Sequence, residues 1–266
     1  MRAIPWIVAL ALASGCAQTR DPAPDDLDGL SRYMFRYFGD DAAMQDAVGK
    51  LIPILEDRGT DEGSAGWRLS NLDDLDTLTI EHPDTDLSRM IGVSMTYDSP
   101  FPVGLHADVQ LDPNQTWLDP ATYIAYDREL IEGEGETFRA GDCAIVTDNY
   151  IHKKGAFGIE FDWGTMRGFQ WVDTPAGRAL VGTGGAYEVA CSDNGATCMH
   201  QSFALEVFYE ASPGQTLRYN GIWMDVTTDF DAVVTDDLRV KMALGGLSDV
   251  FEQTDVHLHD LTVAAD

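Results

Sequence analysis

The stretch LVGTGGAYEVACSDNGATCMHQSFALEVFY, residues 180–209, decides the predicted fold. Two runs of apolar and small residues flank residues 192–197, a turn-forming segment with Asn-Gly at its centre. This pattern is typical of a β-hairpin. Cys191 and Cys198 bracket the turn, and facing positions across a hairpin lie close enough for a disulfide. The sequence therefore predicts a hairpin closed by a Cys191–Cys198 disulfide.

The same pairing sets a register for this hairpin and the next one. With Cys191 opposite Cys198, large residues of one strand face small residues of the other, as Leu205 faces Gly184. A tight Pro-Gly turn at residues 212–215 then adds the following strand to the same side. The predicted apolar face, and candidate ligand-binding surface, consists of Leu180, Phe203, Leu205, Val207, Ile222 and Met224.

Small residues at positions 182, 184 and 186 share this predicted face. If the sheet curves, they leave a cavity, and an apolar pocket is a ready ligand site. The alternative is that the large side chains and the preceding helices fill the space at ordinary packing density.

The rest of the chain supports a mainly β, antiparallel fold, a sandwich or barrel, with a short helical element before it. Residues 77–266 carry short apolar runs separated by turn clusters about every ten residues, as expected for such folds. The predicted strands include residues 105–111, 238–244 and 255–261. Residues 27–57 show helical spacing, so α+β by content is the alternative class. Residues 16–26 are predicted to form a flexible, Pro-containing tether.

The N-terminus has the features of an export signal. Arg2 precedes the apolar run Ile4–Leu12, and Ala13-Ser14-Gly15-Cys16 follows. This segment resembles the lipobox of bacterial lipoprotein precursors. The resemblance implies removal of residues 1–15, lipidation of Cys16 with palmitate among the acyl groups, and a lipid bilayer as partner. Ala17 follows the cysteine, and by the sorting rule of lipoproteins the lack of Asp at this position favours the outer membrane of the cell envelope. The alternatives are an ordinary secretory peptide cleaved nearby and a short membrane anchor.

Composition excludes one large class of partner. The chain has 266 residues, with 45 Asp and Glu against 17 Lys and Arg, and a formal net charge of −28. Nucleic-acid phosphates would be repelled, so no nucleic-acid partner is predicted. Acidic side chains favour solubility and the binding of divalent cations.

One acidic motif suggests carbohydrate chemistry. Glu160-Phe161-Asp162-Trp163 is similar to the start of the E-x-D-x-x-E signature of a family of jelly-roll glycoside hydrolases. In that family two glutamates serve as nucleophile and acid. Thr165 stands where the third acid belongs, so the acid/base has no occupant. Trp163 and Trp171 are candidates for sugar stacking. The alternative is a polar strand face above core aromatics.

Two further groups invite chemical interpretation. Asp255, His257 and His259 alternate along a predicted strand and could hold a divalent metal such as zinc with a fourth ligand from elsewhere. The alternative is an amphipathic strand without metal, and no other cofactor is predicted. Cys143 also allows two interpretations. It is either a reactive thiol or a small core residue, and we expect the core residue.

No nucleophile elbow, phosphate loop or zinc-protease motif occurs in the sequence. The leading prediction is therefore a noncatalytic, membrane-anchored binding protein for an apolar or amphipathic small ligand. The alternatives are a carbohydrate-binding or glycoside-hydrolysing domain and a structural or interaction protein of the envelope without a small ligand.

Overall fold

The chain folds around one large antiparallel sheet. A computed structural model describes residues 20–58, 66–154, 160–229 and 235–265. Within these ranges the strand order is β1-β2-β9-β8-β6-β5-β4-β3, and β7 pairs with β8. The strands are β1 (Trp67–Leu69), β2 (Ile91–Ser99), β3 (Tyr123–Glu132), β4 (Ile145–Lys154), β5 (Glu160–Thr174), β6 (Gly177–Ala186), β7 (Ala190–Cys191), β8 (Thr197–Ser212) and β9 (Gln215–Thr228).

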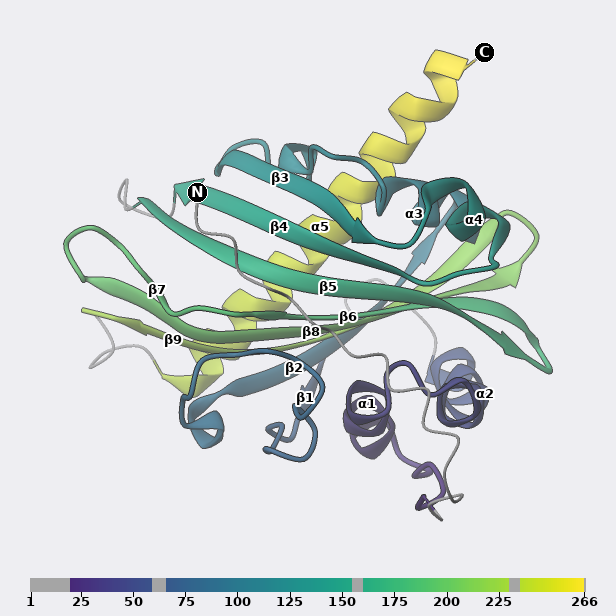
Figure 1. Cartoon of the computed structure of the whole chain (residues 1–266), viewed down its shortest axis with the longest axis horizontal. Helices are drawn as coiled ribbons and strands as arrows, with labels where there is room; N and C mark the ends of the chain where they lie inside the picture. The colour runs from purple at the N-terminus through teal and green to yellow at the C-terminus, as the bar shows by residue number, and fades with distance from the viewer. Residues whose placement is uncertain (1–19, 59–65, 155–159, 230–234, 266) are drawn as a thin grey trace.

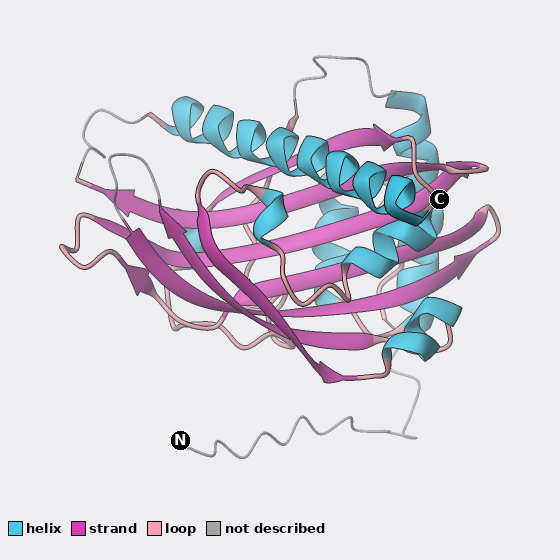
Figure 2. Cartoon of the chain, turned by 90° about the horizontal axis from the view of Figure 1, so that it is seen from above, coloured by secondary structure: helices cyan, strands magenta, loops and turns pink. Residues whose placement is uncertain are grey.

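Helices, rather than a second sheet, cover the two faces (Figures 1 and 2). The helices are α1 (Leu27–Arg36), α2 (Asp41–Arg58), α3 (Val103–Val109), α4 (Gly135–Ala140) and α5 (Asp236–Ala265), with 3-10 turns η1 (Leu87–Arg89) and η2 (Thr116–Leu118). We call the side covered by α1 and α2 the α1–α2 face and the opposite side the α5 face. The predicted mainly β antiparallel class with N-terminal helices is confirmed.

The N-terminal helices form where the apolar spacing predicts them. Asp26 caps α1 by accepting a hydrogen bond from the backbone N–H of Gly29 at 2.8 Å. Asp40 caps α2 in the same way through the N–H of Ala43 at 2.9 Å. The buried side of α1 carries Met34, which packs into the core between this helix pair and the sheet.

The main core lies between this helix pair and the sheet. Phe35 of α1 meets Phe203 and Trp223 edge-on, with ring centroids 5.4 and 5.8 Å apart. Leu205 and Val207 are fully buried in the same cluster. Burying a large apolar side chain contributes about 1.5–3 kcal/mol, so this layer supplies much of the stability.

The disulfide is confirmed, but the register beyond it is not. Cys191 and Cys198 face each other and are bonded, with 2.05 Å between the sulfurs. Between the Ala190–Met199 pair and the Gly185–Phe203 pair, the β6–β7 side holds one more residue than β8. Phe203 therefore pairs with Gly185, whereas the predicted partner was Ala186.

A second irregularity shifts the next hairpin in the same way. It lies between Glu210 and Ser212 of β8, and it places Ile222 opposite Ala204 instead of Leu205. A shift of one residue moves a side chain to the other face of the sheet. The prediction that both hairpins share one apolar face is therefore wrong.

Residues 236–265 form the long helix α5, so the strands predicted at 238–244 and 255–261 are wrong. The residues of α5 that pack toward the sheet follow helical spacing: Val240, Leu244, Leu247, Phe251, Thr254 and Leu258. The strand predicted at residues 105–111 is likewise largely α3. In the described ranges, none of the helices, α5 included, has the length and apolar character needed to cross a membrane.

Candidate functional site

The predicted ligand-binding residues divide between the two faces. Phe203, Leu205 and Val207 belong to the core beneath α1 and α2. Leu180 lies on the α5 face, in a cluster with residues of α3 and α4. The remaining two, Ile222 and Met224, pack against the first half of α5. The structure therefore does not bring these six residues together as a ligand surface.

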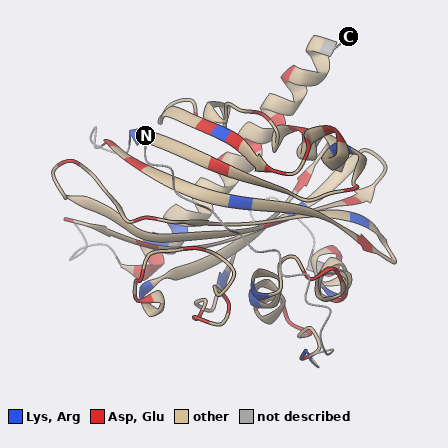
Figure 3. Cartoon of the chain, in the orientation of Figure 1, with Lys and Arg blue, Asp and Glu red and all other residues tan. Residues whose placement is uncertain are grey.

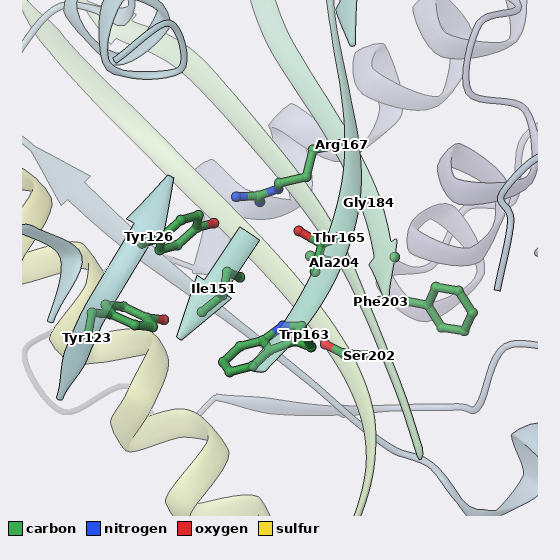
Figure 4. A pocket seen from close by; sticks show the side chains of 11 residues that line it. Tyr123, Tyr126, Ile151, Trp163, Thr165, Arg167, Gly184, Ser202, Phe203 and Ala204 are labelled. Carbon is green, nitrogen blue, oxygen red and sulfur yellow. The ribbon is translucent and has the colours of Figure 1, made fainter. Parts of the chain in front are cut away.

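A pocket of about 170 Å³ occurs instead on the α5 face, near the end formed by β3, β4 and β5 (Figure 4). Its lining residues are Tyr123, Tyr126, Ile151, Trp163, Thr165, Arg167, Gly184, Gly185, Ser202, Phe203 and Ala204. Phe203 lines the pocket with its backbone only, because its ring points away toward α1 and α2 (Figure 4).

The wall of this pocket is aromatic. Tyr123 and Tyr126 meet edge-on with ring centroids 5.2 Å apart, and Trp163 stacks on Phe161 at 5.0 Å. Burial, and then the neighbouring Tyr126, raises the pKa of Tyr123, so its hydroxyl stays protonated at neutral pH. These rings offer a large apolar surface with hydroxyl groups at one edge.

The floor of the pocket is polar. Arg167 donates a hydrogen bond from Nη2 to Oε2 of Glu206 at 2.5 Å, and both side chains are largely buried. Burial alone would lower the pKa of Arg167, but the carboxylate of Glu206 more than offsets this effect and raises it. The hydroxyl of Tyr126 points toward the same guanidinium (Figure 4). Thr165 Oγ1, also in the floor, is buried and has no hydrogen-bond partner among the described residues.

Glycines in β6 explain how this floor forms. A Cβ at Gly184 would lie 2.8 Å from Cγ of Arg167, and one at Gly182 would lie 2.5 Å from the ring of Phe169. Neighbouring side chains therefore lean over β6 into the space that the glycines leave. The space that the sequence predicts to be empty at these two positions is occupied.

A second, larger hollow of about 510 Å³ lies at the ends of α1 and α2. Asp25, Asp26 and Asp57 line it together with only three apolar residues. Because Asp26 is engaged as the cap of α1 and the rim is acidic, this hollow offers little to an apolar ligand.

The residues of the carbohydrate motif are separated by the sheet. Glu160 and Asp162 lie beside His152, on the face of the sheet opposite Trp163. Oε2 of Glu160 is 3.7 Å from Nε2 of the imidazole, and Oδ1 of Asp162 is 3.5 Å from its Nδ1. Trp171 lies far along β5, where its Nε1 donates to the carbonyl of Phe138 at 2.7 Å. Acids and tryptophans therefore do not form one sugar-binding platform.

The residues of the metal motif lie on α5 and point to different partners. Asp255 accepts a hydrogen bond from Ser99 at 2.5 Å, and His257 stacks on Trp117 with 4.2 Å between ring centroids. His259 is exposed. The predicted shared strand face is wrong because the segment is helical, and no group of three or more metal-ligating residues occurs within the described ranges.

One Ser, His and Asp cluster connects three elements on the α5 face. Ser99 of β2 bonds Asp255 of α5, and Nε2 of His106 in α3 lies 3.0 Å from the Ser99 oxygen. Burial, and then Arg218, lowers the pKa of His106 well below its usual value, so the imidazole is neutral. Serine stands between the other two, whereas a nucleophilic triad requires histidine in that place. The cluster therefore fixes α5 rather than activating a nucleophile.

The two remaining cysteines have different outcomes. Cys143 is half-buried beside the cluster of α3 and α4, and its thiol donates to the carbonyl of Glu134 at 3.6 Å. The predicted lipidation residue, Cys16, lies outside the described residues.

The sequence reasoning missed the polar floor entirely. The sequence feature that indicates such a floor is a charged residue at an inward position of an otherwise apolar strand. Arg167, between Trp163 and Phe169, is one example, and Glu206, within FALEVF, is another. Charged side chains are almost never buried without a partner. Such residues on different strands of one sheet are therefore candidates for a shared polar site.

No protein-family model and no curated protein matches the chain. Solved structures with a similar arrangement include a protein of Thermus thermophilus, with a TM-score of 0.46 and 14% identity, covering 64% of this chain and 98% of that chain. A STAR-related lipid transfer protein of Xanthomonas axonopodis gives 0.44 and 10%, covering 66% and 97%. An aromatase/cyclase of a Streptomyces species gives 0.42 and 13%, covering 64% and 94%. Similarities at this level do not determine what the chain binds.

Proposed function

We propose that this chain is a noncatalytic binding protein for a small apolar or amphipathic molecule, which it holds in the pocket on the α5 face. The observation that carries the proposal is the combination of an aromatic wall with a few buried polar groups in the floor. Ligand pockets are typically apolar with a small number of placed polar groups.

The size of the pocket limits what enters it. An engineered apolar cavity of about 150 Å³ binds benzene, so a volume of about 170 Å³ holds one ring or a short alkyl chain, and the rest of a larger molecule would extend through the open side of the pocket. Trp163 and Tyr126 would contact the apolar part, and Arg167 and Thr165 would lie near a polar end.

The proposal includes a lipid anchor at the N-terminus, supported by Ala13-Ser14-Gly15-Cys16 after an apolar run. The predicted tether is not free along its described part, because Ala23 is 3% exposed in the core beside α1 and α2 and its N–H donates to Asp46 at 3.1 Å. A lipid on Cys16 would therefore hold the folded part close to the bilayer surface, where amphipathic molecules are concentrated. Metabolic labelling with an alkyne-bearing palmitate analogue tests this part. Label is expected on the wild type and absent from Cys16→Ser, and an unlabelled wild type would refute the anchor alone.

Binding of the neutral fluorescent probe N-phenyl-1-naphthylamine tests the pocket. The wild type should bind the probe with enhanced fluorescence. Ala204→Trp places an indole in the pocket and should abolish binding while the circular dichroism spectrum is retained. Ala176→Trp, in the exposed β5–β6 turn, is the matched control and should bind like the wild type. Unchanged binding by Ala204→Trp, or no binding by the wild type, would contradict the proposal.

A further inference from the structure

The α5 face concentrates positive charge in a strongly acidic protein. Acidic residues occur throughout the fold and basic residues are few (Figure 3). Nevertheless three arginines, Arg128, Arg167 and Arg218, are buried or largely buried on this one face. The carboxylates near them are Glu206 and the half-buried Asp255, and only Arg167 and Glu206 form an ion pair. Arg128 and Arg218 are therefore left without an ion pair among the described residues.

Of these two, Arg128 is the one that lies beside the pocket. It is 6% exposed, and its Nε donates to Oδ1 of Asn149 at 2.7 Å while Nη1 donates to both oxygens of Gln110. All of these partners are neutral, and no carboxylate of the described ranges lies within ion-pair distance. Its Nη2 is buried without a hydrogen-bond partner there. A buried cation without an anion is costly to stability.

The orphaned guanidinium lies next to the pocket. Arg128, Asn149 and Thr165 occupy adjacent register positions on β3, β4 and β5, so their side chains share one face. Asn149 also donates to the carbonyl of Thr165 at 3.0 Å. The Arg128 guanidinium carbon lies 6.0 Å from the ring centroid of Tyr126, which lines the pocket.

Two guanidiniums meet around one aromatic ring at this place. Arg128 lies 5.9 Å and Arg167 lies 5.5 Å from the ring centroid of Phe169. Glu206 is paired with Arg167, so the site as a whole carries one excess positive charge. That charge matches a monoanion such as a carboxylate better than a phosphate monoester, which carries close to two negative charges.

We propose that the pocket binds its ligand through a carboxylate head group on an apolar body, received by the guanidinium of Arg128 and the hydroxyl of Thr165 beside the Arg167–Glu206 pair. This inference rests on the proposed function and names the chemistry of the ligand. Arg128 Nη2 and Thr165 Oγ1 donate to the carboxylate oxygens, and the alkyl or aryl part lies against Trp163 and Tyr126.

Octanoate and octanamide, which have the same size and differ in charge, test the proposal. Both are titrated calorimetrically into the full chain at pH 7 and used to displace N-phenyl-1-naphthylamine. The wild type should bind octanoate about ten to a hundred times more tightly, the worth of a charged hydrogen bond. Equal affinity, or tighter binding of octanamide, would overturn the proposal.

Arg128→Met keeps the volume of the side chain and removes the charge. It should reduce octanoate affinity to the octanamide value and leave octanamide unchanged. Arg68→Met, at a largely exposed arginine of β1, is the matched control and should retain the preference. An Arg128→Met protein that still prefers octanoate would refute the assignment of the head group.

If Arg128→Met does not fold, two other measurements still test the proposal. They are octanoate and octanamide binding by Thr165→Val and the same comparison in the wild type. Removing the hydroxyl should weaken octanoate binding several-fold with little effect on octanamide. If the wild type binds the fluorescent probe but neither octanoate nor octanamide displaces it, the carboxylate assignment fails and the proposed function stands. If the wild type binds none of the three, both fail.

Discussion

Arg167 on β5 and Glu206 on β8 form an ion pair across the intervening strand β6, with 2.5 Å between Nη2 and Oε2. β6 places Gly184 beside Arg167 and Gly182 beside Glu206. Any larger residue at these two positions would collide with Arg167 or with the ring of Phe169. The glycine-rich part of β6 is therefore what allows a charged pair to form on an otherwise apolar face.

Glu206→Gln should destabilise the protein by about 3–5 kcal/mol, because it leaves the largely buried guanidinium of Arg167 without its carboxylate. The double change Arg167→Met and Glu206→Leu should recover most of this loss, since no buried charge then remains. Urea unfolding at pH 7 measures both. Asp173→Asn, which breaks the exposed Asp173–Arg178 pair, is the control and should change stability little. Equal losses at both sites would contradict the expectation.

Leu205→Trp should destabilise the protein by about 2–3 kcal/mol, because Leu205 is fully buried beneath α1 and α2, where there is no room for an indole. Ala204→Trp, one residue away, points into the pocket and should be far better tolerated. Thermal and urea unfolding compare the two. If Leu205→Trp were neutral and Ala204→Trp unfolded the protein, the assignment of the two faces would be reversed.

Local signals predicted the parts of the fold that depend on neighbouring residues. The Asn-Gly turn between Cys191 and Cys198 identified the hairpin, and the helical spacing of residues 27–57 identified the helix pair α1 and α2. The register could not be predicted because it depends on one extra residue between Gly185 and Ala190 on the β6–β7 side and on an irregularity at Ala211 of β8, and nothing in the local sequence requires an extra residue at either place.

The candidate site depended on the same register. With each hairpin shifted by one residue, Phe203, Leu205 and Val207 lie beneath α1 and α2, whereas the other predicted members of that face lie on the α5 face: Leu180, Ile222 and Met224. A strand with large residues on both sides, such as FALEVF, does not say by its pattern which side meets a helix. The buried charges were the better evidence for a site.

Stability should fall as the pH is lowered from 7.5 to 5.5, and His106 should contribute to this fall. Its pKa lies well below the usual value in the folded protein, whereas the unfolded chain takes up a proton near pH 6.5. Below that pH, protonation therefore favours the unfolded chain, by up to about 1.4 kcal/mol per pH unit. His106→Gln should flatten this slope in urea unfolding, and His259→Gln, at an exposed position, should not. Identical slopes for all three proteins would contradict the expectation.

Asp76→Asn should weaken the attachment of the loop of residues 70–80 to α1, where Asp73 keeps its own ion pair with Arg32. The side chain of Asp76 is only 1% exposed and accepts hydrogen bonds from Arg32 Nε at 2.7 Å and from Arg36 Nη2 at 2.7 Å. Asparagine keeps the shape but removes the charge, which weakens both charge-assisted bonds. Because the two arginines remain about one-third exposed and can be solvated, we expect a loss of about 2 kcal/mol rather than the larger loss of a fully buried pair. Asp74→Asn, at an exposed neighbouring position, is the control for urea unfolding. A loss at Asp74 as large as at Asp76 would show that general charge reduction, not the bridge to α1, stabilises this loop.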